Sequence, residues 1–291
     1  MAELKKRVGL LGWPAEHSLS PVMHNAAFKA LGMEDEWEYD LLPTPPNELE
    51  VQVKSLAAKH YVGANVTIPH KQTIIPFLNS VAVAARGVGA VNTLLIENGR
   101  IEGHNTDVVG LRADLEANGI QLHSLKVLVL GAGGAAHAAV LSLANAGATV
   151  TIINRHSQRA WDLYRDVRRG VSTNFNVSVQ EMSSLGKIAP TVQLIVNCTS
   201  AGMAPHYTDS SPWQANVPIP ANVTVYDMVY RPAVTLFMQQ AQDAGAQVIG
   251  GLGMLVQQGA ASFQLWTGKE PPIEVMFAAA QEALTAPASE G

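Results

Sequence analysis

The chain has almost no cysteine and few charged residues. Cys198 is the single cysteine among 291 residues, so no disulfide can form within the chain, as suits the reducing cytoplasm. Charged residues make up 15% of the chain, the net charge is −5, and no block of lysine and arginine is present. These shortages predict a cytoplasmic protein that has no nucleic-acid partner.

Long apolar runs and metal-binding spacings are lacking as well. Residues 127–153 are mostly apolar, but glycines, His137 and Asn145 interrupt them, so strand, turn, helix and strand explain this stretch better than a membrane span. The charged residues near the start precede only a short apolar stretch, which is not typical of a signal peptide. The nine histidines show no metal-ligand spacing. We therefore expect neither a membrane association nor a metal.

The middle of the chain does contain a glycine-rich turn, made of Gly131, Ala132, Gly133 and Gly134. The apolar residues 126–130 before it predict a buried parallel strand, and residues 135–146 after it predict a helix that stops at Gly147. This order brings backbone N–H groups and a helix N-terminus against a pyrophosphate. Glycine turns also join strands to helices where no ligand binds, so the turn alone does not decide between the two uses.

The next predicted strand indicates which dinucleotide the turn would hold. Residues 149–153 are followed by Asn154, Arg155, His156 and Arg159, with no carboxylate where an NAD-binding unit places one for the ribose. A guanidinium can engage a 2′-phosphate through two hydrogen bonds. The alternative is a solvated basic helix start, which is disfavoured because cations there oppose the helix dipole. The sequence therefore predicts NADP rather than NAD.

Strands and helices alternate almost throughout, which predicts an α/β fold with parallel sheets. We expect an N-terminal open α/β substrate domain of residues 1–103 plus 240–291. A Rossmann-type NADP-binding domain of residues 104–239 should complete the chain, with a cleft between the two domains. Residues 92–101 predict a hairpin around Asn98-Gly99, and Pro69 predicts the first turn of a short helix.

Two strand ends before the glycine turn carry side chains suited to proton transfer. Lys71 should lie beside the helix that begins at Pro69, where positive charge is unfavourable, so a functional reason for the lysine is favoured. Asp107 follows another strand and, taken alone, is equally well explained as a helix N-cap. Because ligands bind at the carboxyl ends of strands in open α/β sheets, the two side chains together predict a catalytic pair.

Several segments, in this order, resemble the shikimate dehydrogenase family over nearly the whole chain. They are residues 18–21, 65–71, 89–93, 105–107, 131–136, 154–155 with Arg159, and 253–255 with Gln258. Each segment is several residues long, so together they are highly specific. Two positions depart from the family pattern: Val108 stands where glycine is common, and His156 where threonine is usual.

The resemblance implies roles at the matching positions. The catalytic pair would be Lys71 and Asp107. The substrate carboxylate would be held by Ser18, Ser20 and Tyr230. The substrate hydroxyls would be bound by Thr67, Asn92, Asp107 and Gln258. The pyrophosphate would lie on Gly131, Ala132, Gly133, Gly134 and Ala135. The adenosine end would meet Asn154, Arg155 and Arg159, and the nicotinamide would lie near Met228 and Gly251.

The residues alone leave some of these roles undecided. Ser20 before Pro21 is also a good helix N-cap, Tyr230 is also explained as a surface or hinge residue, and Met228 as core filler. Gln258 shares a helical stripe with Met254 and Ser262 that should face inward, where an amide needs hydrogen-bond partners.

The resemblance implies an NADP-dependent oxidoreductase that reduces 3-dehydroshikimate to shikimate reversibly, as a monomer or a homodimer. Two alternatives remain. One is a quinate/shikimate dehydrogenase that uses NAD, and the other is a non-catalytic NADP-binding regulator on the same fold. Arg155 and Arg159 argue against the first, and the presence of both Lys71 and Asp107 argues against the second.

Overall fold

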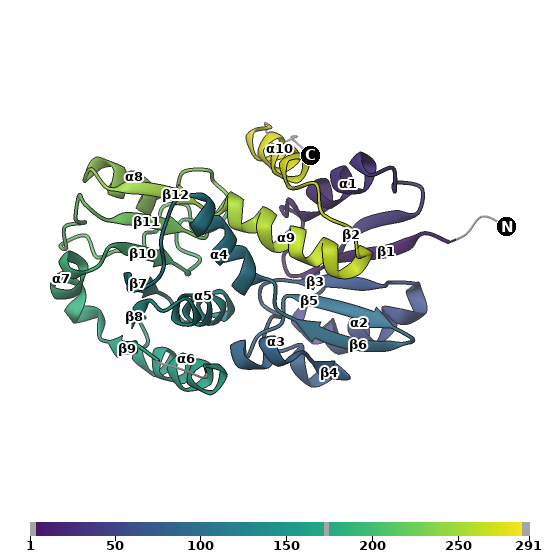
Figure 1. The fold of residues 1–291 in the computed structure, drawn as a ribbon, viewed down its shortest axis with the longest axis horizontal. Helices are drawn as coiled ribbons and strands as arrows, with labels where there is room; N and C mark the ends of the chain where they lie inside the picture. The colour runs from purple at the N-terminus through teal and green to yellow at the C-terminus, as the bar shows by residue number, and fades with distance from the viewer. Residues whose placement is uncertain (1–3, 172–174, 287–291) are drawn as a thin grey trace. The chain divides into compact units, whose positions relative to one another are not determined.

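The computed structural model describes residues 4–171 and 175–286, and it divides into two compact units (Figure 1). The first unit is Met1–Thr106 with Val256–Gly291, and the second is Asp107–Leu255. The chain re-enters the first unit at residue 256 and not at the expected residue 240. The reason is that residues 247–250 add a strand to the sheet of the second unit.

The first unit contains a mixed sheet in the order β2-β1-β3-β5-β6-β4. Its strands are β1 (Lys6–Gly12), β2 (Trp37–Pro43), β3 (Gly63–Val66), β4 (Ser80–Val81), β5 (Thr93–Glu97) and β6 (Arg100–His104). The predicted hairpin is confirmed, because β5 and β6 pair antiparallel across Asn98 and Gly99. Both turn residues have positive φ, 51° and 74°, as a two-residue hairpin turn of this kind requires.

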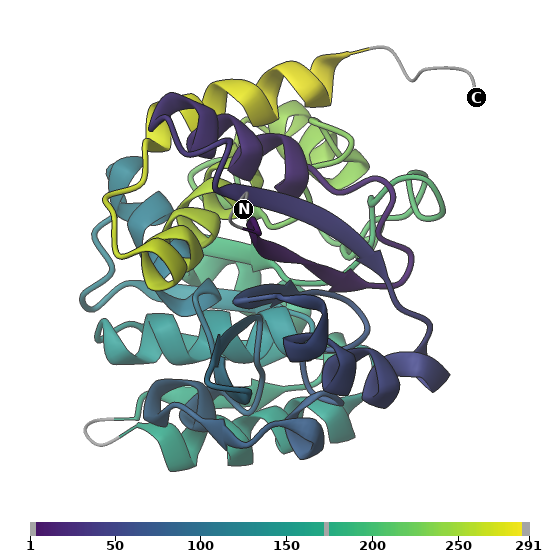
Figure 2. The same ribbon diagram turned by 90° about the vertical axis from the view of Figure 1, so that its right-hand side faces the viewer.

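The first unit also contains helices. They are α1 (Ser20–Ala30), α2 (Leu49–Ser55), α3 (Val83–Val88), α9 (Leu252–Thr267), whose first turn precedes the unit boundary, and α10 (Ile273–Thr285). Short 3₁₀ turns lie at η1 (Pro46–Glu48), η2 (Ala57–Lys59) and η3 (Ile75–Phe77). Apolar side chains of α2 pack against β1, β3 and β5 in a core that includes Leu11, Leu56 and Leu94. Helices α1 and α10 lie side by side (Figure 2).

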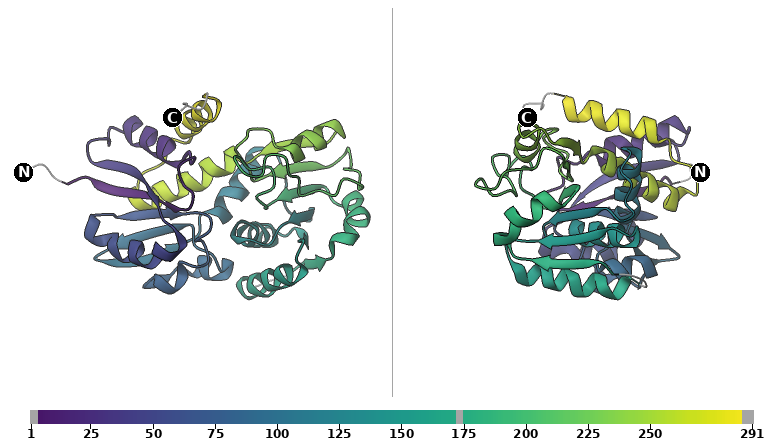
Figure 3. Two further views of the ribbon diagram at one scale, coloured as in Figure 1. Left: turned by 180° about the vertical axis from the view of Figure 1, so that it is seen from behind. Right: turned by 60° about the vertical axis from the view of Figure 1, so that its left-hand side comes forward.

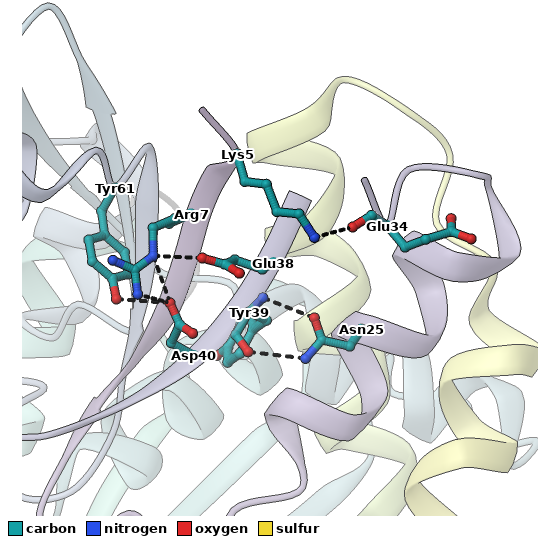
Figure 4. A network of polar contacts seen from close by, with 8 residues as sticks. All are labelled: Lys5, Arg7, Asn25, Glu34, Glu38, Tyr39, Asp40 and Tyr61. Atoms are coloured by element: carbon teal, nitrogen blue, oxygen red, sulfur yellow. Dashed lines mark hydrogen bonds and ion pairs between the residues drawn. The ribbon is translucent and has the colours of Figure 1, made fainter. Parts of the chain in front are cut away.

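The outer strand β2 is tied to its neighbours by polar side chains (Figure 4). Arg7 on β1 forms ion pairs of 2.8 Å with Glu38 and with Asp40, and the Tyr61 hydroxyl donates to Asp40 at 2.9 Å. On α1, the Asn25 amide accepts from the Tyr39 backbone N–H at 2.9 Å and donates to its carbonyl at 3.1 Å. The side chain of Asn25 thus satisfies backbone groups that an outer strand would otherwise leave unpaired.

A buried histidine lies between α1, β2 and α9. The His24 ring stacks on Tyr39 with centroids 4.5 Å apart, and Trp266 lies 5.4 Å away. His24 is fully buried, and neither of its ring nitrogens has a hydrogen-bond partner among the described residues. Burial disfavours the charged ring and lowers the pKa of His24 to about 3.

The second unit contains an entirely parallel sheet in the order β12-β11-β10-β7-β8-β9, which runs from top to bottom in Figure 1. Its strands are β7 (Lys126–Leu130), β8 (Thr149–Ile153), β9 (Val177–Gln180), β10 (Leu194–Asn197), β11 (Thr224–Asp227) and β12 (Gln247–Gly250). Numbered from β7 onward, this is the 3-2-1-4-5-6 order of a dinucleotide-binding fold. The α/β prediction with a Rossmann-type domain is confirmed.

Helices of the second unit are α4 (Asp107–Ala117), α5 (Gly134–Asn145), α6 (Ser157–Gly170), α7 (Leu185–Ile188) and α8 (Leu236–Asp243). Short 3₁₀ turns η4 (Met182–Ser184) and η5 (Ala189–Thr191) flank α7. The helices α5 and α6 pack together and are seen end-on in the left view of Figure 3. Of the helices in the described part of the chain, none is both long and apolar enough to cross a bilayer.

His24 should make the first unit sensitive to acid. As the pH falls below 6.5, the unfolded chain takes up a proton on this ring, but the folded chain does not until about pH 3. The part of the unfolding free energy that depends on a neutral His24 is therefore lost as the pH falls from 6.5 to about 3. Between about pH 8 and pH 5, the wild type should lose about 2 kcal/mol of unfolding free energy that His24→Phe retains.

Urea unfolding followed by tryptophan fluorescence measures this difference. The exposed His17→Gln variant is the control and should follow the wild type at both pH values. An equal acid loss in His24→Phe and in the wild type would contradict the assignment.

Candidate active site

The residues expected to hold a carboxylate lie at the beginning of α1. The helix begins at Ser20, and the residue at its N-cap is Leu19, so Ser20 is not the N-cap. Instead the Ser18 hydroxyl accepts from the Ser20 backbone N–H at 3.2 Å and donates to the Ser20 hydroxyl at 3.2 Å. Two hydroxyls therefore lie together where the positive end of a helix dipole favours an anion.

Lys71 lies in a turn and not at a helix start. The Thr67 carbonyl accepts from the His70 N–H at 2.8 Å across a cis Ile68–Pro69 bond, so residues 67–70 form a reverse turn, and no helix opens at Pro69. The predicted helix is wrong, and the dipole argument for Lys71 fails with it. The buried ring of His70 contacts the Thr44 carbonyl at 2.7 Å, which ties this turn to the end of β2.

Asn92 is the centre of a buried polar network in the first unit. Its side-chain oxygen accepts from the Thr106 N–H at 2.7 Å, and its side-chain nitrogen donates to Gln258 at 3.2 Å. Asn92 directly follows Val91, whose N–H donates to the Lys71 carbonyl at 2.7 Å. Hydrogen bonds to residues 91 and 92 thus hold the backbone of Lys71, the amide of Gln258 and the residue before Asp107.

A second layer of this network consists of residues that had no predicted role. The Asn65 amide donates to Ser262 at 2.9 Å and accepts from the Tyr39 hydroxyl at 2.9 Å. Thr93 shares short contacts with Ser262 (2.8 Å) and with Thr106 (3.1 Å). Several of these residues lie within the segments that carry the resemblance. Their place in one network was not predictable because they come from four distant elements.

Gln258 lies on an inward face of α9, as the sequence predicts. The predicted inward stripe of α9 is observed, because Met254, Gln258 and Ser262 are all buried. Thr67 is half-buried after β3, and its methyl group would lie 2.4 Å from a Cβ at Gly12, so glycine is required there.

Asp107 and Tyr230 belong to the second unit. Asp107 is the first residue of α4, is 3% exposed, and directly follows Thr106 in the chain. Helix α4 is tied to α5 by the Ser142 hydroxyl, which donates to the Val108 carbonyl at 2.8 Å. Tyr230 is half-buried in the segment after β11.

The glycine turn has the geometry that a pyrophosphate needs. Gly131 has a φ of +112°, and a Cβ there would approach the Cys198 and Thr199 atoms beyond β10 to 3.1 Å. Gly133 is the N-cap of α5, and a Cβ there would meet no atom within 4 Å. Since β7 and β10 flank the point where the strand order reverses, the turn lies where open α/β sheets bind ligands. The residues present therefore fit a dinucleotide.

The expected adenosine contacts lie between β8 and α6. Asn154 donates to the His156 carbonyl at 2.9 Å, which shapes the turn. Arg155 and Arg159 are exposed, and neither guanidinium pairs with a carboxylate among the described residues. Both positive charges are available for an anion.

A buried carboxylate organises the ends of β10 and β11. Asp227 is fully buried and accepts from Asn197 (2.8 Å), from the Val229 N–H (3.0 Å) and from Thr235 (2.7 Å). Burial raises the pKa of Asp227, and these hydrogen bonds oppose that rise. The residue after it, Met228, is thereby held against Gly251: a Cβ on Gly251 would lie 2.3 Å from the Met228 carbonyl oxygen. The structure brings together the two residues expected near a nicotinamide.

Comparison with known proteins gives matches over most of the chain. A model described as the shikimate dehydrogenase substrate binding domain matches residues 10–94, one described as shikimate / quinate 5-dehydrogenase matches 114–208, and one described as the shikimate 5'-dehydrogenase C-terminal domain matches 251–281. A shikimate dehydrogenase (NADP(+)) of Symbiobacterium thermophilum is 43% identical over 95% of this chain and 94% of that protein.

Two solved structures are similar to this chain over nearly its whole length. Shikimate 5-dehydrogenase from Thermus thermophilus, in complex with NADP(H) and shikimate, has a TM-score of 0.85 and 37% identity, covering 96% of this chain and all of that one. Quinate dehydrogenase from Corynebacterium glutamicum, in complex with NAD, also has a TM-score of 0.85 but 26% identity, covering 94% of this chain and 98% of that one.

Gly251 should not tolerate a side chain. In Gly251→Ala, the new methyl group would lie 2.3 Å from one backbone oxygen and 3.0 Å from another, so β11 and β12 must shift. We expect a loss of about 2–3 kcal/mol of unfolding free energy, measured by urea unfolding. The matched control is Gly186→Ala in α7, where the nearest atom is 3.8 Å away; it should be neutral or stabilising by about 0.5–1 kcal/mol. Equal stability of the two variants would contradict the packing.

Proposed function

Because the chain belongs to the shikimate dehydrogenase family, we propose that it interconverts 3-dehydroshikimate and shikimate with NADP as the hydride carrier. The observation that carries the proposal is the Asn92 network. Asn92 holds Gln258 and the backbone of Thr106, the residue before Asp107. The neighbouring Val91 N–H holds the carbonyl of Lys71. The resemblance assigns Gln258, Asp107 and Lys71 to the substrate site. Similarity over nearly the full length of the Symbiobacterium protein supports the same activity.

Lys71 and Asp107 form the proton-transfer pair of the proposed reaction. NADPH, when bound, supplies a hydride to the ketone carbon. The electrons of the carbonyl double bond move to its oxygen, and the Lys71 ammonium delivers the proton that completes the hydroxyl. Asp107 acts as the second member of the pair, and the reverse reaction returns the proton to Lys71. Such positioning lowers the barrier because the reacting groups need not be brought together by diffusion.

The substrate ring is held by hydroxyl and amide groups. Ser18 and Ser20 hold its carboxylate at the N-terminus of α1, with Tyr230 as the third contact. Thr67, Asn92 and Gln258 bind its hydroxyls. Rigid support from the Asn65 and Ser262 layer keeps these amides oriented, so that an incorrect ring leaves buried polar groups unpaired.

Residues at the carboxyl edge of the second sheet would hold the cofactor. Gly131 to Ala135 would bind the pyrophosphate, Arg155 and Arg159 would bind the 2′-phosphate, and Asn154 shapes their turn. Met228 and Gly251 would line the nicotinamide end. The single cysteine, Cys198, suits a cytoplasmic enzyme that works as a monomer or a homodimer on small molecules.

Cofactor and substrate choice test the function directly. The wild type should have a higher kcat/KM with shikimate and NADP than with quinate and NAD. The double variant Arg155→Ala, Arg159→Ala loses charge-assisted hydrogen bonds to the 2′-phosphate, so its KM for NADP should rise about tenfold or more. Initial rates of NADP reduction, followed by absorbance, measure both effects.

Arg165→Ala, farther along α6 and paired with Asp162, is the matched control and should leave the KM for NADP unchanged. A preference for quinate with NAD would replace the proposed activity by that of a quinate dehydrogenase. Tight NADP binding without turnover of either acid would reject catalysis altogether.

Lys71 should matter for turnover more than for cofactor binding. Lys71→Met keeps the length of the side chain but removes its proton, so kcat should fall by a factor of about 10²–10⁴. The Kd of NADP, measured by fluorescence titration, should stay within about twofold, because such a loss removes transition-state stabilisation only.

The control is Lys59→Met, an exposed lysine that contacts Gln52, which should keep the wild-type kcat. If kcat and NADP affinity fell together in Lys71→Met, the role of Lys71 would be structural, and the proton-transfer assignment would be wrong.

A further inference from the structure

Helix α9 begins at a position that has no capping side chain. Its first residue is Leu252, and the Gly251 carbonyl accepts from the Leu255 N–H at 3.0 Å, so Gly251 is the N-cap. The first N–H groups of a helix need an acceptor, which the side chain of an N-cap residue usually provides. Gly251 has no side chain, and its packing against the Met228 carbonyl leaves no room for one.

Asp114 on α4 provides the acceptor that Gly251 lacks. The Met254 backbone N–H, in the first turn of α9, donates to the Asp114 carboxylate. This is the contact that an N-cap side chain makes in other helices, and it places a carboxylate at the positive end of the helix dipole. Gly253 must lack a side chain for the same reason, because a Cβ there would overlap the Asp114 carboxylate.

Two further hydrogen bonds hold the carboxylate itself. Asp114 is 6% exposed, and the hydroxyl of the fully buried Tyr226 on β11 donates to one of its oxygens. The Asn118 amide donates to the other oxygen at 3.2 Å. A buried carboxylate with several donors is held in one orientation, because each lost bond would leave a buried polar group unpaired. Asp114 therefore ties the first turn of α9 to α4 and to the second sheet.

We propose that Asp114 is a positioning residue for hydride transfer, which caps α9 from outside so that Gly251 stays against Met228. This inference rests on the proposed function, in which Gly251 and Met228 line the nicotinamide end of the cofactor. The Gly251 N–H donates to the Val229 carbonyl at 3.4 Å, a long bond that holds the N-cap only weakly. Without the Asp114 cap, the first turn of α9 would fray and Gly251 would move away from Met228.

Single-turnover oxidation of NADPH by 3-dehydroshikimate tests this role. Asp114→Ala removes the cap, so the rate constant at saturating substrate should fall about tenfold. A merely structural loss would reduce the amount of active protein, which lowers the amplitude and leaves the rate constant unchanged. The Kd of adenosine 2′,5′-bisphosphate, which has no nicotinamide, should stay within about twofold, because only the nicotinamide end is disturbed.

Gly253→Ala tests the same contact from the side of α9. The new methyl group would displace the Asp114 carboxylate, although alanine itself favours a helix more than glycine does. We expect the same fall in the rate constant, and no further fall in the double variant Asp114→Ala, Gly253→Ala, because one contact is lost in all three. Asp114→Asn should stay within about threefold of the wild type, since its amide oxygen can still accept from the Met254 N–H.

Asn118→Ala is the matched control, because it removes a bond to the same carboxylate but keeps the bond from Met254. It should have the wild-type rate constant. An unchanged rate constant in Asp114→Ala or in Gly253→Ala, losses that multiply in the double variant, or a bisphosphate Kd that rises as the rate falls would each overturn the role of Asp114. Failure of the wild type to oxidise NADPH with 3-dehydroshikimate would instead reject the proposed function.

Discussion

The first unit depends on the hydrogen bonds of one buried side-chain amide, that of Asn92. A polar group that is 1% exposed must find partners inside the protein, and it finds them on Thr106 and Gln258. These residues come from the segment before α4 and from α9, far apart in the sequence. Satisfying one amide therefore fixes three segments at once, and those segments carry the residues proposed to bind substrate.

The second unit uses a buried carboxylate in the same way. Asp227 at the end of β11 binds Asn197 at the end of β10, the backbone of Val229 and the N-cap hydroxyl of α8. The carboxyl ends of parallel strands are where the chain leaves the sheet and where ligands bind. Polar groups at these ends therefore do two things: they hold loops that the sheet does not hold, and they keep the Met228 backbone close to Gly251.

Local patterns predicted the second unit well, because its elements are continuous in sequence. Strands β7 and β8 match the apolar runs at residues 126–130 and 149–153, and α5 lies within a residue of the expected bounds. Prediction failed at Pro69, since proline favours a helix start and a reverse turn alike. The bond between His70 and Thr44 belongs to the turn, and no local pattern shows it. The boundary at residue 240 failed because pairing of β12 with β11 is a long-range contact.

The amino-acid order alone was sufficient for the α/β class, the dinucleotide turn, the preference for a 2′-phosphate and the candidate side chains, because each depends on residues within a few positions of one another. Folding in three dimensions settled which of those side chains meet. The Asn92 amide and the Asp227 carboxylate take partners from distant elements. Pairing of this kind follows from burial, which forces each polar atom to bond whatever group the packing brings within reach.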